Sequence, residues 1–195
     1  MPVIDQLTGN EVSGERWVPT ASAGGDEVLV NLERYLYACH HVAGKTVLDA
    51  GCGSGLGSYL YSLSAKKVFA VDYSDEAHAY AARFPFIDGK VSFIKANLEN
   101  IEDIKKLPQT DICVAIEFLE HIDDPAMFLE NIRAEVLVFS VPLHSLAVSK
   151  HHKFAIKDEY DVKKLIDPFY NVGQYHVQNK RWIYGSGVRR NVPLR

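Results

Sequence analysis

The segment from Val47 to Gly57 constrains the fold more than any other part of the chain. Its sequence, VLDAGCGSGLG, is a short apolar run that ends in an acid and then places glycine at every second position. The apolar run predicts a strand buried on both faces. The glycines predict a turn where a ligand or a helix approaches the backbone closely. Such a turn at the carboxyl end of a parallel strand is the usual ligand crevice of an open α/β sheet.

The spacing of these glycines narrows the choice of ligand. A dinucleotide-binding turn has glycine at its first, third and sixth positions. Counted from Gly51, the sixth residue is Leu56, and counted from Gly53 it is Ser58, so the dinucleotide pattern is absent in both registers. The pattern present, Asp49-x-Gly51-x-Gly53-x-Gly55, resembles the first motif of the class I S-adenosylmethionine (SAM) methyltransferases. SAM carries an ammonium and a sulfonium rather than a phosphate, so an acid beside the glycines favours it. An ordinary glycine-rich turn is the alternative.

The order of the predicted elements indicates the fold class. Strands are predicted at residues 46–48, 67–72, 90–95, 111–116 and 135–141, with helices at 26–42, 58–64, 74–83, 125–133 and 158–165. Two further strands, 170–178 and 181–184, are joined by a tight turn at Asn179-Lys180. This order predicts an α/β fold: a doubly wound, mostly parallel seven-stranded sheet with a reversed C-terminal strand and helices on both faces.

Length and composition limit the organisation and the partners. With 195 residues, 47% of them hydrophobic, the chain suits one SAM-binding domain at residues 26–195 after an irregular arm at residues 1–25. The formal charge of −4 provides no general basic field, so we expect no nucleic-acid partner. The cysteines lie far apart, which suits a reducing cytoplasm, and we expect neither a signal peptide nor a membrane span. The oligomeric state stays open.

The resemblance assigns roles around the cofactor. It implies that Asp49, Gly51 and Gly53 hold the methionine end of SAM and that Asp72 accepts hydrogen bonds from the ribose hydroxyls. It also implies that Tyr73 flanks the adenine and that Asn97 contacts the adenine amino group, with Leu98 as a further cofactor-binding candidate. Asp72 could instead cap the next helix, although Ser74 or Asp75 would fit that role better. Asn97 could equally be a polar loop residue with no ligand.

A second stretch, Glu117 to Pro125, resembles the E-x-L-E-H-x-x-D-P segment of the small-molecule branch of the same family. It lacks the [DNS]-P-P-[YFW] loop of the nucleobase-amine methyltransferases, which take a flipped base. Glu117, at the end of the fourth predicted strand, is a candidate for the wall beside the methyl donor, and it is predicted both as a cofactor-binding and as a catalytic residue. His121 is a candidate base for an acceptor hydroxyl, since neutral imidazole is the natural base near neutral pH. A hydrogen bond from His121 to the backbone is the alternative.

A group of histidines follows the fifth strand: His144, His151 and His152. The resemblance implies an acceptor-facing loop here, with His144 as a further catalytic candidate. Metal binding is the alternative, but an i, i+4 histidine pair and a nearby set of carboxylates are missing from the sequence pattern. No metal site is therefore predicted.

The N-terminal arm contains Arg16 and Trp17, which are costly to leave in water without a role. In the family, the arm and the first helix fold over the methionine end, so Arg16 or Tyr35 is predicted to contact the cofactor carboxylate or the acceptor. In the alternative, Trp17 covers a sheet edge and Arg16 is solvated.

Taken with the resemblance, these features predict a SAM-dependent methyltransferase. Its acceptor would be a hydroxyl or amine of a small polar metabolite, with a sugar or a glycan precursor as one candidate class. Two alternatives remain: an NAD-dependent oxidoreductase on the same fold class, and a SAM-binding partner subunit without catalysis.

Overall fold

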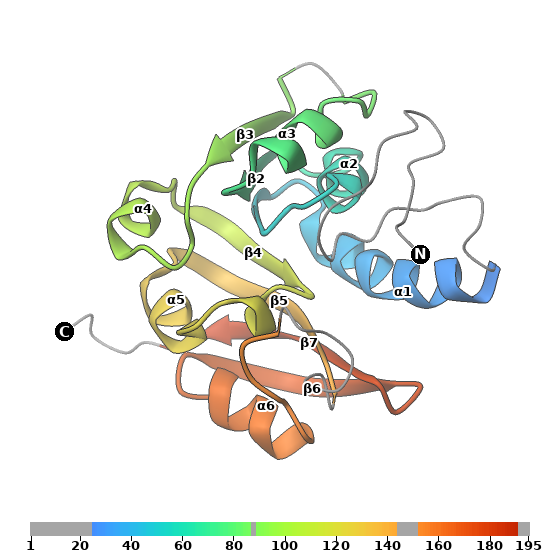
Figure 1. The fold of residues 1–195 in the computed structure, drawn as a ribbon, viewed down its shortest axis with the longest axis vertical. Coiled ribbons are helices and arrows are strands. Elements are labelled where there is room, and N and C mark those ends of the chain that lie inside the picture. The colour runs from blue at the N-terminus through green and yellow to red at the C-terminus, as the bar shows by residue number, and fades with distance from the viewer. Residues whose placement is uncertain (1–24, 87–88, 144–151, 191–195) are drawn as a thin grey trace.

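A computed structural model describes residues 25–86, 89–143 and 152–190 of the chain. Within them, seven strands form one sheet in the order β3-β2-β1-β4-β5-β7-β6 (Figure 1). Their bounds are β1 Thr46–Ala50, β2 Lys67–Asp72, β3 Val91–Lys95, β4 Thr110–Ile116, β5 Ala134–Pro142, β6 Tyr170–Gln178 and β7 Trp182–Arg189. Strands β1 to β5 pair in parallel, whereas β7 runs antiparallel to both β5 and β6. The predicted fold class is confirmed.

The helices are α1 Gly25–Val42, α2 Leu56–Ser62, α3 Asp75–Ala81, α4 Ile101–Lys106, α5 Pro125–Asn131 and α6 Glu159–Ile166, with a 3₁₀ turn, η1, at Leu119–His121. Helices α1 and α2 pack on one face of the sheet, and α3 lies next to α2 (Figure 1). Helices α4, α5 and α6 cover the other face. The molecule therefore has three layers, as a doubly wound sheet requires.

Strand β4 shows why the sheet must be covered on both sides. Its residues alternate between two cores: Ile112 and Val114 pack with α1 and α2, whereas Cys113 and Ala115 pack with α4 and α5. All four are at most 3% exposed. A strand with apolar side chains on both faces can only be central, which places β1 and β4 side by side in the middle of the sheet.

Local capping fixes the starts of several helices. The side chains of Ser74, Asp124 and Asp158 each accept a hydrogen bond from a backbone N–H in the first turn of α3, α5 and α6. Pro125 occupies the first turn of α5, where the helix predicted at residues 125–133 begins. Helix α1 begins at Gly25, one residue before the helix predicted at residues 26–42.

Two short elements were missed by the sequence analysis. Helix α4 has six residues and η1 has three, so neither is long enough to show helical periodicity. The signal available for α4 was Asn100, whose side chain accepts a hydrogen bond from the N–H of Glu102. In the described ranges, no helix has the length and apolar character needed to cross a membrane.

Candidate functional site

A cavity of about 680 Å³ opens at the carboxyl ends of β1, β2, β3 and β4. This is the point where the strand order reverses, with β2 and β3 on one side of β1 and β4 on the other. The cavity lining includes most of the predicted site residues: Tyr35, Gly51, Gly53, Asp72, Tyr73, Asn97, Leu98, Glu117 and His121. The fold thus brings together residues from α1 and from four strand ends.

The glycine turn forms the floor beside β1. Gly51, Gly53 and Gly55 have φ angles of +68°, +51° and +84°, which residues with a β-carbon adopt only with strain. A β-carbon on Gly51 would also overlap the ring of Phe118, which follows β4. Glycine at this position therefore allows the turn and the end of β4 to pack together.

Asp72 fixes the turn from the neighbouring strand. Its two carboxylate oxygens accept hydrogen bonds from the N–H groups of Gly53, at 3.0 Å, and Ser74, at 2.9 Å. The cap of α3 is the Ser74 side chain, so the alternative role of Asp72 as the cap is wrong. Each carboxylate oxygen can accept a further hydrogen bond, which leaves Asp72 able to take two ribose hydroxyls.

Asp49 lies behind the turn, outside the cavity lining in the part of the chain that the structure describes. Its side chain is 5% exposed and accepts a hydrogen bond from the Ser58 hydroxyl at 2.5 Å. Burial raises the pKa of Asp49 to about 7; the Ser58 hydrogen bond opposes this shift and the Asp72 charge adds to it. Asp49 thus connects β1 to α2, and its contact with the methionine end remains a prediction.

Tyr73, Asn97 and Leu98 line the cavity just after the ends of β2 and β3. Tyr73 is 71% exposed, which leaves its ring accessible to a ligand, and Leu98 is buried. The Asn97 side-chain oxygen accepts a hydrogen bond from the N–H of Glu99 at 3.0 Å. This bond forms a local turn and occupies one of the two lone pairs of the oxygen. A contact from Asn97 to adenine stays a prediction.

Glu117 ends the cavity beyond β4. Its backbone has a φ of +50°, and its carboxylate accepts hydrogen bonds from the Ser140 hydroxyl at 2.6 Å and the Trp182 indole N–H at 2.9 Å. The guanidinium Nε of Arg34 lies 3.6 Å from the same carboxylate. Residues from α1, β5 and β7 therefore hold Glu117 in one orientation at the cavity wall.

Arg34 is the largest side chain buried at this end, and the sequence analysis did not assign it to the site. Its guanidinium donates to the side-chain oxygens of Gln178, at 2.7 Å, and Asn31, at 2.8 Å, and it stacks 4.6 Å from the centre of the Trp182 ring. A signal existed, because Arg34 falls on the buried stripe of α1 four residues before Ala38. An arginine on an apolar stripe needs polar partners within the fold.

Tyr35 follows Arg34 and also lines the cavity. Burial raises the pKa of its phenol far above the ordinary value, and the charges of Asp49 and Glu117 act in the same direction. Tyr35 therefore carries a neutral hydroxyl. Its predicted contact with the cofactor carboxylate or the acceptor stays a prediction. Two other candidates, Arg16 and His144, lie outside the described residues.

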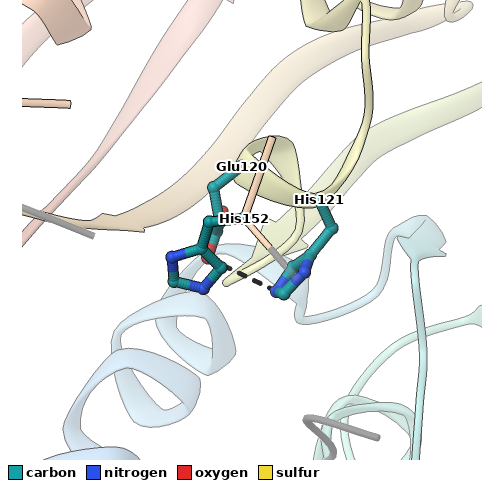
Figure 2. A group of neighbouring side chains, drawn as sticks. All are labelled: Glu120, His121 and His152. Carbon is teal, nitrogen blue, oxygen red and sulfur yellow. Dashed lines mark ion pairs between the residues drawn. The ribbon is translucent and has the colours of Figure 1, made fainter. Parts of the chain in front are cut away.

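His121 lines the cavity at the end of η1. Its ring lies edge-to-face with that of His152, 4.8 Å between centroids, and its Nε2 lies 3.8 Å from a carboxylate oxygen of Glu120 (Figure 2). In the sequence, Glu120 belonged to the quoted motif without a role of its own, and His152 belonged to the histidine group for which metal binding was the alternative to an acceptor-facing loop. His121 and His152 are 31 positions apart in the chain, and only the fold brings them together.

Comparisons with known proteins agree with this geometry. Residues 48–136 match the family model described as a methyltransferase domain. The chain is 31% identical over 132 residues to a probable SAM-dependent methyltransferase of Mycobacterium tuberculosis, covering 62% of this chain and 42% of that protein. It is 32% identical over 99 residues to the mitochondrial ubiquinone biosynthesis O-methyltransferase of Schizosaccharomyces pombe, covering 48% of this chain and 35% of that protein. The chain thus spans less than half the length of these curated relatives.

The fold also matches solved structures. The N-methyltransferase NodS of Bradyrhizobium japonicum, solved with S-adenosylhomocysteine, superimposes with a TM-score of 0.68 at 13% identity, covering 87% of this chain and 90% of NodS. Identity this low speaks for the fold alone, but the sequence match covers the glycine turn and Asp72 as well. The methyltransferase-domain match over residues 48–136, the curated relatives and the structural neighbours thus support a class I SAM methyltransferase.

Proposed function

We propose that this protein binds SAM in the 680 Å³ cavity and transfers its methyl group to a small polar metabolite. The observation that carries the proposal is the joint placement of the glycine turn and Asp72 at one end of a cavity whose other end is formed by Glu117 and His121. The cavity has the size of a small-molecule site, about 300 to 1,000 Å³. A donor and an acceptor both need places in it, and the two ends provide them.

Methyl transfer from SAM requires alignment of the donor and the acceptor more than it requires reactive side chains. The sulfonium activates the methyl group, so the protein must hold the acceptor in line with the S–CH₃ bond and exclude water. Asp72 and Glu117 are acids on the cavity wall that suit a cationic ligand. His121 lies at the acceptor end, where an imidazole can take the proton of a hydroxyl.

A hydroxyl is the favoured acceptor group. His121 supplies a possible base, which an alcohol or phenol needs and a neutral amine does not. The name of the fission-yeast relative states O-methyl transfer for that protein. Sugars, glycan precursors and phenols are therefore the first acceptors to screen, with amines as the second group.

Ligand binding tests the cofactor. We expect S-adenosylhomocysteine to bind in isothermal titration calorimetry and NAD to give no heat at the same concentrations. Asp72→Ala should weaken binding by about 2 to 4 kcal/mol, roughly 30- to 1,000-fold, because two hydrogen bonds to a carboxylate are lost. The matched control is Asp75→Ala, since Asp75 is 81% exposed and pairs with Lys95 outside the cavity. Binding of NAD alone would overturn the proposal, whereas equal affinity of the folded Asp72→Ala protein would overturn only the ribose contact of Asp72.

Turnover separates an enzyme from a SAM-binding partner subunit. Candidate acceptors are incubated with the protein and SAM, and release of S-adenosylhomocysteine is measured. Release that depends on an acceptor supports the enzyme. Binding without release across hydroxyl and amine acceptors would favour the partner subunit.

For the cellular location we propose a reducing cytoplasm, supported by the three cysteines, which remain thiols in the fold.

A further inference from the structure

Glu120, His121 and His152 form a compact group at the acceptor end of the cavity (Figure 2). Each offers one ligand atom, and these atoms all lie within 4.8 Å of one another. Glu120 and His121 come from η1 after β4, and His152 comes from the segment after β5. The group unites two parts of the chain that the sequence analysis treated separately.

The backbone holds these two segments together. The N–H of Lys153 donates a hydrogen bond to the carbonyl oxygen of Glu120 at 2.8 Å, which fixes the residue after His152 against η1. The Lys153 ammonium also lies 3.2 Å from the Asp123 carboxylate. Glu120 is 1% exposed, so its carboxylate is enclosed by protein, whereas the His121 side chain keeps 27% of its surface accessible. The group thus has a fixed, buried acid and an imidazole that faces the cavity.

Two imidazole nitrogens and one carboxylate oxygen are a typical ligand set for divalent zinc, iron, cobalt or manganese. With bonds of about 2.0 to 2.2 Å, the ligand atoms around one such ion lie roughly 3 to 4 Å apart. The observed limit of 4.8 Å leaves a small approach, which rotation of the two imidazoles can supply. Three protein ligands also leave coordination positions open, as in catalytic rather than structural sites.

We propose that Glu120, His121 and His152 bind a divalent transition-metal ion whose open position holds an acceptor oxygen. The location supports this role, because His121, Ile122 and Lys153 all line the cavity. The inference rests in part on the proposed methyl transfer, which supplies the donor. It also narrows the acceptor to molecules with two neighbouring oxygens, such as a vicinal diol or a catechol, since these chelate a metal with open positions.

The ion gives the acceptor a route to reaction without a free base. Coordination lowers the pKa of the acceptor hydroxyl, so its O–H bond breaks and the proton leaves to water. The oxygen then forms a bond to the methyl carbon while the C–S⁺ bond breaks, and the sulfur keeps the electron pair as a neutral thioether. His121 cannot bind the ion and serve as the base through the same nitrogen, so metal binding replaces its role as a base.

Metal binding is measured without turnover. The full chain is stripped with a chelator, dialysed and titrated with Zn²⁺ by calorimetry, and Co²⁺ is added separately to follow its visible ligand-field absorption. We expect one ion per chain, and at least a tenfold loss of affinity in His152→Ala and in Glu120→Gln. The matched control is His176→Ala, because His176 stacks on Tyr184 and is outside the group. Because Glu120 is buried, the thermal unfolding of each variant is measured to confirm that it is folded. If Glu120→Gln does not fold, the metal affinity of His152→Ala decides the result.

The outcomes separate this inference from the proposed function. One ion per chain that is lost in the folded His152 variant, with S-adenosylhomocysteine binding unchanged, supports the metal site. Absence of binding, or equal affinity in the folded His152→Ala protein, would overturn it and leave an ordinary glutamate–histidine contact. Failure of S-adenosylhomocysteine to bind overturns the cofactor proposal alone, because the metal titration does not use it. In an active enzyme, chelator should abolish transfer to a diol or catechol, and Zn²⁺, Co²⁺ or Mn²⁺ should restore it.

Discussion

The two ends of the cavity are built in different ways. At the cofactor end, the contacts join residues close in sequence: Asp49 with Ser58, nine residues apart, and Gly53 with Asp72, 19 apart. At the acceptor end, Trp182 reaches Glu117 across 65 residues and Arg34 reaches Gln178 across 144. The cofactor end is one strand–turn–helix–strand unit, whereas the acceptor end exists only when α1, β4, β5 and the C-terminal hairpin have assembled.

This difference shows where a sequence motif is informative. When the contacting residues are close in sequence, their spacing is visible in the chain, so the glycine turn and the acid after β2 are enough to identify the cofactor end. The acceptor end depends on the insertion of β7 between β5 and β6, which places Trp182 opposite Pro142 and close to Glu117. Substitutions at four places, each with a control or a paired variant, test whether the two ends respond as differently as their construction suggests.

The largest effect is expected for Gly51→Ala. The new methyl group meets the Phe118 ring at a φ of +68°, so the variant combines backbone strain with overpacking. We expect a loss of about 4 kcal/mol in the free energy of unfolding and at least about a 100-fold loss of S-adenosylhomocysteine affinity. Urea unfolding and calorimetry measure the two.

Gly44→Ala is the control for Gly51→Ala, because Gly44 has a similar φ of +71° but no atom within 4 Å of the added carbon. It should lose only about 1 kcal/mol and bind normally. Equal losses of stability and affinity in Gly51→Ala and Gly44→Ala would mean that the contact with the Phe118 ring does not cause the effect of Gly51→Ala.

A smaller loss is expected for Arg34→Met at the acceptor end. Methionine keeps an apolar stem beside Trp182 but leaves Glu117 and Gln178 without their cationic partner. Breaking a buried ion pair costs about 3 to 5 kcal/mol. Because Glu117 is 28% exposed, we expect about 2 to 3 kcal/mol in urea unfolding.

The control for Arg34→Met is Lys105→Met, whose exposed pair with Glu102 should contribute less than about 0.5 kcal/mol. If Arg34→Met unfolds like the control, the network at this end does not stabilise the fold. The S-adenosylhomocysteine affinity of the folded Arg34→Met protein, compared with that of the wild type, then shows whether a change at the acceptor end alters binding at the cofactor end.

Asp49 should make stability depend on pH at the cofactor end. Its pKa is about 7 in the fold against an ordinary value of 3.8, so between these values the native state keeps a proton that the unfolded chain has lost. The free energy of unfolding must then fall as pH rises, by about 1.4 kcal/mol per pH unit from this group. Asp49→Asn removes the effect, and the difference between the two proteins should change steadily from pH 5 to 7.

Asp111→Asn is the control for Asp49→Asn. Hydrogen bonds from the Thr46 backbone and hydroxyl hold the pKa of Asp111 below its usual value. Asp111 therefore stabilises the fold above pH 4, and this contribution is lost only as pH falls further. The difference in the free energy of unfolding between the wild type and Asp111→Asn should stay constant from pH 5 to 7. Parallel stability curves for the wild type and Asp49→Asn over this range would contradict the raised pKa of Asp49.

The smallest effect is expected in the hairpin turn, which lies outside the cavity lining. Asn179 and Lys180 have φ angles of +50° and +57°, the geometry that favours glycine at the second position. Lys180→Gly should raise the free energy of unfolding by about 0.5 kcal/mol and the melting temperature by about 1 to 2 °C, with S-adenosylhomocysteine affinity unchanged. Asn179→Ala should act in the opposite direction by about 1 kcal/mol. A shift of both variants in the same direction would contradict this turn geometry.

The sequence by itself determined the strands, the glycine turn and the acid after β2. These follow from apolar runs, from residue types that few backbone conformations accept, and from spacing within one local unit. It missed α4 and η1 because three to six residues are too few for a period to show. The start of α1 differed by one residue from the predicted helix range.

Only the tertiary structure decided which polar side chains share the acceptor end. Arg34 looked like one arginine on a helix, and Glu120 and His152 belonged to separate segments, yet the fold buries Arg34 against Trp182 and sets His152 beside His121. The physical reason is that hydrogen bonds and ion pairs between distant segments leave no period and no fixed spacing in the chain. They form because the sheet order places β4, β5 and β7 side by side, and burial then requires each polar group to have a partner.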